Sequence, residues 1–364
     1  MIEKEIKKRL NNIGFVELKE DTTVGGFTFL KEVPLPILVD DIKKLAIEKN
    51  DIGVKSDLIT KGMIYVLGCD EDFKYKDSYK EVLESLIKDL KGFVIGTTLK
   101  AEDELDKYIY LNSYEALGIK DDEILYNKLV YLENYLDKNR NKIKEEDQSE
   151  IIKNLLVNYE RIEDKKISPY ANYRMGIINK AIGNYLKSKM YFEKSLESSD
   201  ILEDEELKTV LRREIEEISD YSNIEIAETY INYSDFDKAE EALSNVSIYY
   251  IDQSYLNFLK GFVYQSTARI ELAIEEYKRA IDLNKNREDY YNSLAICLVN
   301  LNKYKEASII LEEGIENNSS SYNLKYNLGV IYVNLNRLEE GIELLKEAYS
   351  IKPTEELYKY IESL

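Results

Sequence analysis

Apolar and polar positions follow a helical period along most of the chain, and from residue 254 the pattern repeats every 34 residues. Small residues recur at one position, Gly261, Ala295 and Gly329. Three further columns keep the same spacing: Tyr264, Leu298 and Tyr332; Ala273, Ala307 and Gly341; Tyr277, Leu311 and Leu345. Each block predicts two helices that approach at the small residues, with the large residues filling the space beside them. One such hairpin cannot bury its apolar stripe alone, so the blocks are expected to stack.

The last block shows the expected boundaries most clearly. Its first helix is predicted from about Tyr322 to Leu335 and its second from Leu338 to Ser350. Pro353 ends the second helix because proline has no amide hydrogen and clashes with the preceding turn. Residues 355–364 are predicted to form a capping helix.

A 34-residue period with this order of small and large residues resembles the tetratricopeptide repeat, TPR. Leu328-Gly329, Tyr332, Ala348 and Pro353 match its pattern. The chain departs from that pattern because it has no Trp and because Lys285 and Ser319 replace two prolines. The resemblance implies a mostly α fold, a right-handed α–α superhelix, that acts as a protein–protein interaction scaffold.

The repeat array is expected to span residues 169–364. An earlier repeat covers 169–202, and the next small residue, Ala227, comes 17 positions late. Residues 203–219 are therefore an insertion of about half a repeat. Their apolar stripe predicts a helix that extends the first helix of the following repeat.

Upstream of the array the pattern is less regular. Residues 1–88 are predicted to form a small α+β or helical cap domain, with a β-hairpin at 15–33 that turns at Gly25-Gly26 and is closed by Pro34 and Pro36. Helices are expected at 38–50, 56–68 and 77–90. Residues 89–168 are expected to hold a degenerate repeat containing Gly96, followed by a long helical hairpin over 123–162.

In the family that the chain resembles, the first helices of successive repeats line a concave groove that binds peptides. Carried over by register, the groove would contain aromatic, aliphatic and Asn side chains: Tyr221, Ile224, Tyr255, Phe258, Phe262, Asn292, Ile296, Asn300, Asn323, Tyr326, Val330 and Asn334. These positions contain almost no basic residue, so a ligand carboxylate would be poorly held and we expect an apolar or helical ligand. The alternative is that Phe258 and Phe262 pack between adjacent repeats.

Composition narrows the function further. The formal net charge of -20 disfavours nucleic acids and anionic membranes as partners. The chain has no His, Walker motif or nucleophile-elbow motif, so we expect no enzyme, no cofactor and no metal. The acidic run after Cys69 lacks the calcium-loop spacing. Cys69 and Cys297 are expected to be reduced, buried thiols.

Three functions remain as hypotheses. The first is a cytoplasmic scaffold, since the N-terminus lacks an apolar leader segment and no apolar run could span a bilayer. The second is a peptide-sensing regulator with an N-terminal effector domain, and the third is a solenoid that only self-associates. The abundance of Ile, Lys, Asn and Tyr suggests AT-rich coding and hence a low-GC bacterial source.

Overall fold

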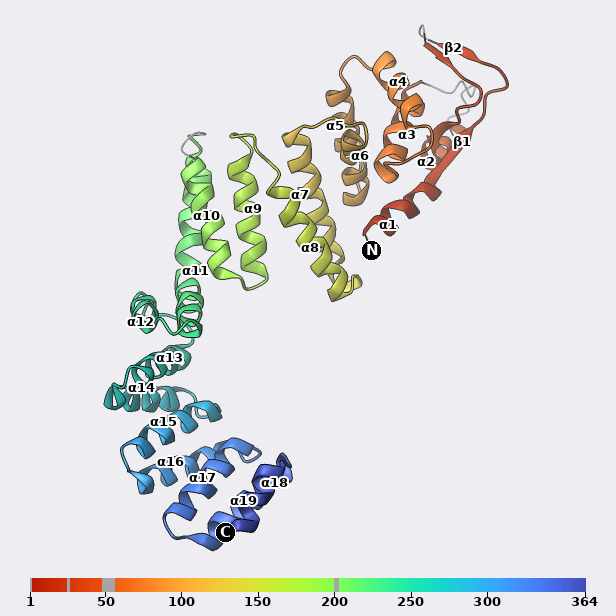
Figure 1. Cartoon of the computed structure of the whole chain (residues 1–364). Helices are drawn as coiled ribbons and strands as arrows, with labels where there is room; N and C mark the ends of the chain where they lie inside the picture. Colours follow the sequence, from red (N-terminus) through yellow and green to blue (C-terminus); the bar gives the residue numbers. More distant parts are fainter. Residues whose placement is uncertain (1, 25–26, 48–55, 200–202) are drawn as a thin grey trace. The chain divides into compact units, whose positions relative to one another are not determined.

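A computed structural model describes residues 2–24, 27–47, 56–199 and 203–364 (Figure 1). The predicted turn at Gly25-Gly26 and the predicted helix end at 48–50 lie outside the described residues. The described residues form 19 α-helices, two short 3-10 helices and four strands. They divide into two compact units: unit 1 comprises Met1–Ile182 and Met190–Arg212, and unit 2 comprises Gly183–Lys189 and Arg213–Leu364.

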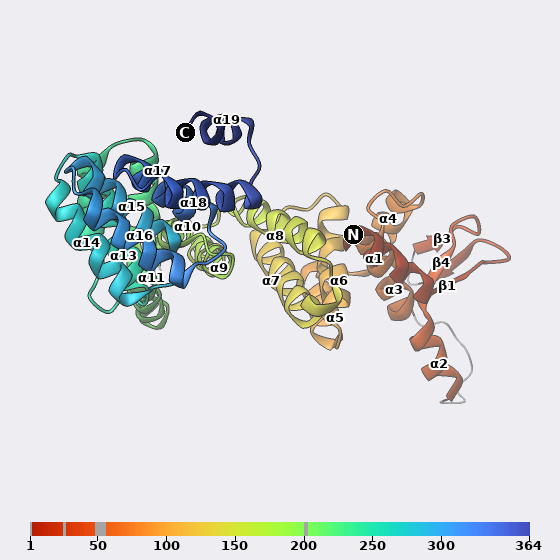
Figure 2. The same cartoon turned by 90° about the horizontal axis from the view of Figure 1, so that it is seen from below.

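Near its start, unit 1 has a β-ribbon in two parts, visible beside α3 in Figure 2. Strand β1 (Ile13–Val16) pairs antiparallel with β4 (Leu35–Leu38), and β2 (Thr22–Val24) pairs antiparallel with β3 (Phe27–Phe29). The predicted hairpin paired the strand that begins at Phe15 with the strand that begins at Phe27. That pairing is wrong, because Phe15 lies opposite Pro36 and Phe27 lies opposite Val24. A proline is tolerated there because each strand of a two-stranded sheet is an edge strand.

Helix α3 (Ser56–Cys69) organises the core of unit 1, and its bounds confirm the predicted helix at 56–68. Met63, Ile64, Val66 and Leu67 on this helix are fully buried. Its glycines allow the backbone of two neighbours to come close, since a Cβ at Gly62 would lie 2.2 Å from the Pro36 carbonyl oxygen and one at Gly68 would lie 1.8 Å from that of Ile109. The other helices before the long hairpin are α1 (Ile2–Lys8), the 3-10 helix η1 (Arg9–Asn12), α2 (Val39–Ile47), α4 (Lys76–Leu86), α5 (Leu90–Lys100) and α6 (Glu104–Ala116).

The helix predicted over 77–90 is in fact two helices. Helix α4 ends at Leu86, and Asp89 caps α5 by accepting a hydrogen bond from the Gly92 N–H at 2.9 Å. Gly96 on α5 lies where the degenerate repeat was expected to bring two helices together, yet a Cβ there would meet nothing within 4 Å. The close helix approach of the regular repeats is thus missing at this glycine.

Where a long helical hairpin was expected over 123–162, the chain forms α7 (Asp122–Asn139) and α8 (Glu145–Tyr159), joined by the 3-10 helix η2 (Arg140–Lys142). Helices α9 (Ser168–Ala181) and α10 (Tyr185–Ser199) follow it. Met175 and Ile178 of α9 share a core with Leu155 of α8, which joins α9 to unit 1.

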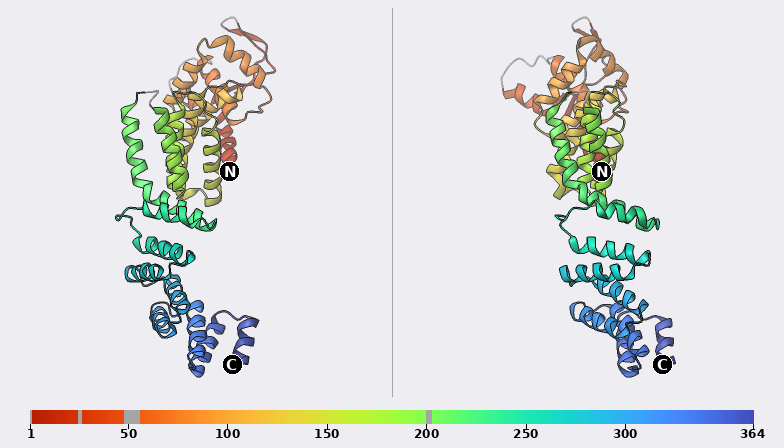
Figure 3. Two further views of the ribbon diagram at one scale, coloured as in Figure 1. Left: turned by 60° about the vertical axis from the view of Figure 1, so that its left-hand side comes forward. Right: turned by 90° about the vertical axis from the view of Figure 1, so that its left-hand side faces the viewer.

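Apart from Gly183–Lys189, unit 2 begins at Arg213, within α11 (Glu205–Asn232), a single 28-residue helix. Residues 205–219 of the expected insertion are continuous with residues 220–232 in this one helix. The remaining helices follow one another in pairs, as Figure 3 shows: α12 (Phe236–Ser244), α13 (Gln253–Ser266), α14 (Ile270–Leu283), α15 (Glu288–Asn300), α16 (Tyr304–Asn317), α17 (Tyr322–Asn334), α18 (Leu338–Ile351) and the capping helix α19 (Glu355–Ser363).

The turn inside each hairpin of unit 2 also repeats every 34 residues. Ser234, Ala268, Asn302 and Asn336 all have φ between 57° and 61°. After each of them the next N–H donates to a carbonyl five residues earlier, as Arg337 does to Tyr332 at 2.9 Å. This bond closes the C-terminus of the first helix in a left-handed cap. The period therefore governs backbone conformation as well as side-chain packing.

Candidate functional site

The first helices of the last two repeats, α15 and α17, border an apolar cavity of about 200 Å³ in unit 2. Four of the predicted groove residues line it: Ile296, Tyr326, Val330 and Asn334. The other lining residues are Ala295, Val299, Tyr304, Leu311, Asn327 and Ile331. All ten are described and uncharged, so the cavity offers apolar surface and amide or hydroxyl groups to a ligand.

Helical geometry explains why these side chains converge. Tyr326, Val330 and Asn334 are four residues apart and therefore share one face of α17. Ile296 occupies the same repeat position on α15 as Val330 does on α17. Ile296 is 46% exposed, which leaves much of an aliphatic side chain available at the surface. The predicted groove residues all belong to one register of the first helices, which excludes Val299 and, on the second helix α16, Tyr304.

The predicted asparagines divide between two roles. The Asn327 side-chain amide donates to Asn292 Oδ1 at 2.9 Å, and that of Asn323 donates to Glu288 Oε1 at 3.1 Å. These two bonds tie α15 to α17. Asn300 and Asn334 are exposed at equivalent repeat positions, and the Asn334 amide donates to the Val330 carbonyl of its own helix at 2.9 Å. Asn300, Asn323 and Asn334 are thus exposed to solvent, and Asn323 is also bonded to Glu288.

A second aromatic group lies where α13 meets α15. The Phe258 ring stacks on Tyr290 with centroids 5.0 Å apart, so the alternative of packing between repeats holds for Phe258. Phe262, by contrast, is 37% exposed. The Tyr255 hydroxyl donates to Glu228 Oε1 at 2.5 Å, and burial together with this carboxylate raises the pKa of Tyr255. The phenol therefore stays protonated and acts as a donor.

Arg287 is a residue of this region that the sequence did not suggest. Its guanidinium lies 5.3 Å from the Tyr290 ring centroid and 5.9 Å from that of Tyr255. It also pairs with Asp289 at 2.7 Å. The cation is thus neutralised locally and provides no free positive charge for a ligand carboxylate.

The first two predicted groove residues are placed differently from the rest. Tyr221 stacks on Tyr185 with centroids 4.7 Å apart and meets Tyr250 edge-on at 5.4 Å. Ile224 is only 6% exposed and belongs to the core around Ala227 and Leu243, contrary to the expectation that it faces a ligand. Ile224 is therefore not available to a ligand.

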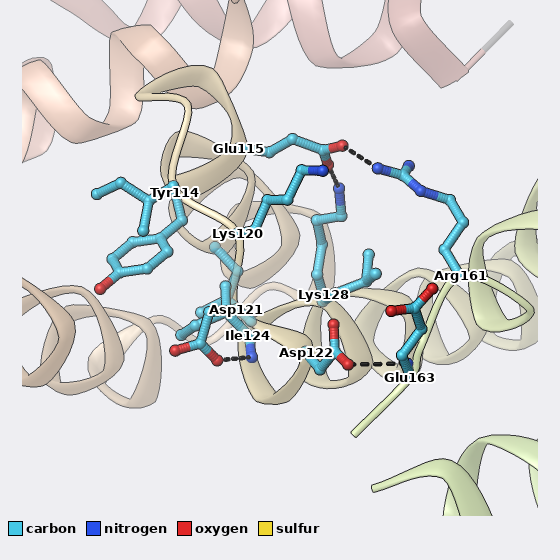
Figure 4. A pocket seen from close by; sticks show the side chains of 12 residues that line it. Tyr114, Glu115, Lys120, Asp121, Asp122, Ile124, Lys128, Arg161 and Glu163 are labelled. Atoms are coloured by element: carbon cyan, nitrogen blue, oxygen red, sulfur yellow. Dashed lines mark hydrogen bonds and ion pairs between the residues drawn. The ribbon is translucent and has the colours of Figure 1, made fainter. Parts of the chain in front are cut away.

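Unit 1 contains a separate cavity of about 320 Å³ between α6, α7 and the segment after α8, drawn in Figure 4. The Glu115 carboxylate bridges the buried ammonium of Lys128 and the Arg161 guanidinium, the latter at 3.2 Å. Asp122 Oδ2 accepts hydrogen bonds from the Glu163 and Asp164 N–H groups at 2.9 and 2.7 Å. These carboxylates are committed to partners within the protein and fix the loop after α8.

The electrostatics of this cavity follow from the same bonds. Burial raises the pKa of Glu115, but the hydrogen bonds from Lys128 and Arg161 outweigh it and leave that pKa below its usual value. The residues of the network lie 13 and 46 positions apart in the chain, and no local sequence pattern joins them. Sequence reasoning had no signal with which to find it.

Cys69 and Cys297 are free and buried, as predicted. Burial raises the pKa of the Cys297 thiol to about 11, so the thiol is not ionised at neutral pH. Within the described residues, no three His, Cys, Asp or Glu side chains converge as a metal site would require. The helices that the structure describes also include none with the length and apolar content needed to cross a membrane.

The family comparison decides what the hairpins are. The sequence model of the tetratricopeptide repeat matches residues 169–200, 254–287 and 322–355. This chain carries tetratricopeptide repeats. The hairpin of α15 and α16 lies between two matched segments and continues their 34-residue register. Tetratricopeptide repeats place the chain among protein-interaction scaffolds.

Solved structures with this repeat are also similar. The crystal structure of YrrB, described as a TPR protein with an unusual peptide-binding site, is 18% identical, with 56% of this chain and 97% of that chain covered and a TM-score of 0.39. A crystal structure of MamA protein is 22% identical, with 39% and 79% covered and a TM-score of 0.36. Another MamA structure is 17% identical, with 51% and 98% covered and a TM-score of 0.36. No curated protein sequence matches the chain.

Proposed function

We propose that the α15–α17 groove, defined by the ten residues that line the cavity of about 200 Å³, binds an uncharged, apolar segment of a partner protein or peptide. The observation that carries this proposal is the absence of charge from all ten lining residues, each of which is described, in a chain whose charged residues make up 33%. Burying a charged ligand group there would cost free energy that no side chain of the lining could repay.

The groove offers both of the interactions that an extended or helical segment needs. Ile296, Val330 and the Tyr326 ring supply apolar surface, and aromatic rings bury large areas at a small entropic cost. Asn334 at the edge of the cavity has an amide that can both donate to and accept from a peptide main chain. The ligand is expected to anchor one or two apolar side chains and to bond through its backbone.

The test is a binding measurement with matched variants. Peptides would be selected from a random display library on the full-length wild type, and their Kd measured by fluorescence anisotropy. We expect neutral peptides with aromatic or aliphatic anchors to be selected. Ile296→Asp should weaken their binding by about tenfold or more, since loss of a central anchor contact costs about 1.4 kcal/mol or more.

Ile309→Asp is the control, because Ile309 is 62% exposed on α16 and does not line the groove. It places the same charge on the same repeat and should leave the Kd unchanged. Equal weakening by both variants, or selection of strongly charged peptides, would contradict the assignment of the groove.

A further inference from the structure

A cavity of about 470 Å³ in unit 1 lies where helix α1 meets the hairpin of α7 and α8. Ile2 of α1 packs on the core that includes Leu132 of α7 and Ile151 of α8 (Figure 1). The lining comes from α1 and from the stretch 135–151, and the cavity is called here the α1 cavity. These two segments are far apart in the chain, so only the fold brings their side chains together.

The α1 cavity is basic although the chain is acidic. The whole chain has 70 acidic and 50 basic residues, whereas residues 2–9 and 138–144 together contain eight basic and two acidic residues. Among the side chains that line the cavity, three are Lys and one is Glu. Two basic segments thus meet at one cavity. Their local excess of positive charge favours an anionic occupant, whatever the net charge of the chain.

Two of the three lysines have no counter-ion within the protein. Among the described residues, no carboxylate lies within ion-pair distance of the Lys4 or the Lys142 ammonium, and both side chains line the cavity. Lys8 pairs with Glu5 at 2.8 Å, so the carboxylate of the lining is already committed. Cations that share a cavity repel one another, and an anion bound between them offsets that repulsion. The α1 cavity can therefore accept an anionic group.

The rest of the lining indicates what the anion carries. Burial raises the pKa of Tyr135, so its hydroxyl stays protonated and can donate a hydrogen bond to an anion. Ile2, Ile143 and Ile151 add aliphatic surface to the same lining. Sites for small molecules commonly combine a mostly apolar wall with a few polar groups that orient the ligand. A ligand with one charged end and an apolar body has both kinds of partner here.

We propose that the α1 cavity binds a small amphipathic anion. Lys4 and Lys142 would hold its carboxylate or phosphate head, and its alkyl or aromatic body would lie against the isoleucines. This site is independent of the α15–α17 groove, which belongs to unit 2 and has an uncharged lining. The bound anion would also tie α1, a helix of 7 residues, to the α7–α8 hairpin. A ligand that binds only the folded state stabilises it, so α1 should open less often when the site is filled.

Isothermal titration calorimetry of the full chain tests the site with three probes that share one alkyl chain: octanoate, octyl phosphate and octanol. We expect at least one of the two anions to bind at a single site, and octanol to bind about tenfold more weakly or not at all. The tighter of the two anions identifies the head group. Affinity for the anions should fall as salt is added, because salt screens their attraction to the lysines.

Lys4→Gln/Lys142→Gln removes both unpaired ammonium groups and should weaken anion binding by about tenfold or more. Lys88→Gln/Lys165→Gln is the matched control, because both lysines are exposed in unit 1, lie outside the lining and change the net charge equally. The control should leave the Kd unchanged. Hydrogen exchange with octanoate or octyl phosphate present, whichever binds, should slow in α1 and in residues 139–151 of the wild type but not of the first variant.

Four results would overturn the inference. They are a wild type that binds neither anion, equal weakening by the two double variants, octanol that binds as tightly as the anions, and anion binding that leaves exchange in α1 unchanged. The last would place the anion elsewhere on the chain. Each of them leaves the proposed function standing, since peptide binding to the α15–α17 groove is measured separately and depends on residues of unit 2.

Discussion

The helices inside unit 1 and the helices inside the repeats of unit 2 pack by different means. Every residue from 254 to 351 is described, and none of the charged ones is buried. There the helices meet at small residues: a Cβ at Gly261 would lie 2.7 Å from the Tyr277 ring, and one at Gly329 would lie 2.8 Å from Leu345. Unit 1 has such a crossing too, at Gly68 against Ile109, but it also buries charged side chains, including Glu104, Lys128 and Glu133.

The difference shows two solutions to the same packing problem. A column of small residues opposite large ones works at any helix crossing of the same geometry, so it can be copied from repeat to repeat. A buried ion pair works only for the two side chains that meet, because each charge needs its own partner when it leaves water. The packing of unit 1 therefore depends on particular pairs of charged side chains, whereas that of unit 2 depends on a repeated column of small residues. Substitutions should destabilise unit 1 most at a buried charge and unit 2 most at a small residue.

The largest expected effect is loss of a buried charge partner in unit 1. Glu133 is 6% exposed and accepts hydrogen bonds from Arg174 and from the Tyr159 hydroxyl. Arg174→Leu leaves that carboxylate buried without its cation, which should cost about 3 kcal/mol. Hydrogen exchange measured by mass spectrometry should show easier opening of α7 to α9.

Arg279→Leu in unit 2 is the matched control. Arg279 pairs with Glu276 at 2.5 Å, but its side chain is 60% exposed. Its loss should change the local opening free energy by less than about 0.5 kcal/mol. Similar effects of the two variants would mean that the units do not differ in how they use charge.

The second effect tests the small-residue columns. In Gly329→Ala the new methyl group would press on Leu345 and on the Gly341 carbonyl oxygen, 3.0 Å away. Overpacking of a helix crossing should destabilise α17 and α18 by about 1–2 kcal/mol after the gain in helix propensity is subtracted. Exchange in those two helices should accelerate.

Gly96→Ala in unit 1 is the same substitution in a helix where a Cβ meets nothing within 4 Å. It should stabilise α5 by up to about 1 kcal/mol through helix propensity alone. A loss of stability there would show that Gly96 does serve a close helix approach, as the predicted degenerate repeat requires.

Gly329 and Gly96 also show which parts of the fold could be predicted from the sequence. The period of 34 placed Gly329 at a helix crossing and predicted the repeats, and the resemblance to the tetratricopeptide repeat implied the groove residues. It could not show that Gly96 lacks a facing helix, because one glycine in a single block has no column to confirm it. Nor could it pair Phe15 with Pro36, since a proline inside a four-residue strand argues against sheet.

The same reasoning explains what was missed at the candidate sites. The groove residues were assigned by the 34-residue register of the repeats, so residues at equivalent positions of successive repeats were predicted as a set. The early end of α12 is hidden by that regularity, because the repeat keeps its length while five helical residues are lost. The cavity network of unit 1 forms only after folding brings together the side chains of Glu115, Lys128 and Arg161. No sequence spacing predicts these contacts.

The third effect is the dependence of the stability of unit 1 on pH in the acidic range. Burial raises the pKa values of Glu104, Glu115 and Asp121, but hydrogen bonds from lysine and arginine partners leave all three lowered. Groups with a lowered pKa stabilise the fold above their unfolded values of about 4, and this contribution is lost as pH falls below about 4. Burial raises the pKa of Asp106 and leaves it raised, so this residue acts in the opposite direction.

Unit 1 should therefore lose about 1 kcal/mol or less of opening free energy between pH 6 and pH 3.5, because solvent screens partly exposed pairs. Hydrogen exchange, corrected for the intrinsic exchange rate at each pH, would measure this loss of opening free energy in α6 to α8. Glu115→Gln should reduce the pH dependence there. An equal loss in α13 to α18 of the wild type would contradict the contrast between the units.

The smallest effect lies in the repeated turn of unit 2. Ala268 has φ of 58°, where a Cβ crowds the following carbonyl, whereas Asn302 occupies the same repeat position with a side chain that tolerates this conformation. Ala268→Gly removes the crowding at some cost in unfolded-chain entropy, so a net gain of about 0.5 kcal/mol is expected in α13 and α14. Asn302→Gly should give almost no gain in α15 and α16. Slower exchange in the first variant but not in the second would show that the period imposes the turn on whichever residue occupies it, whereas equal gains would show that the residue type is irrelevant there.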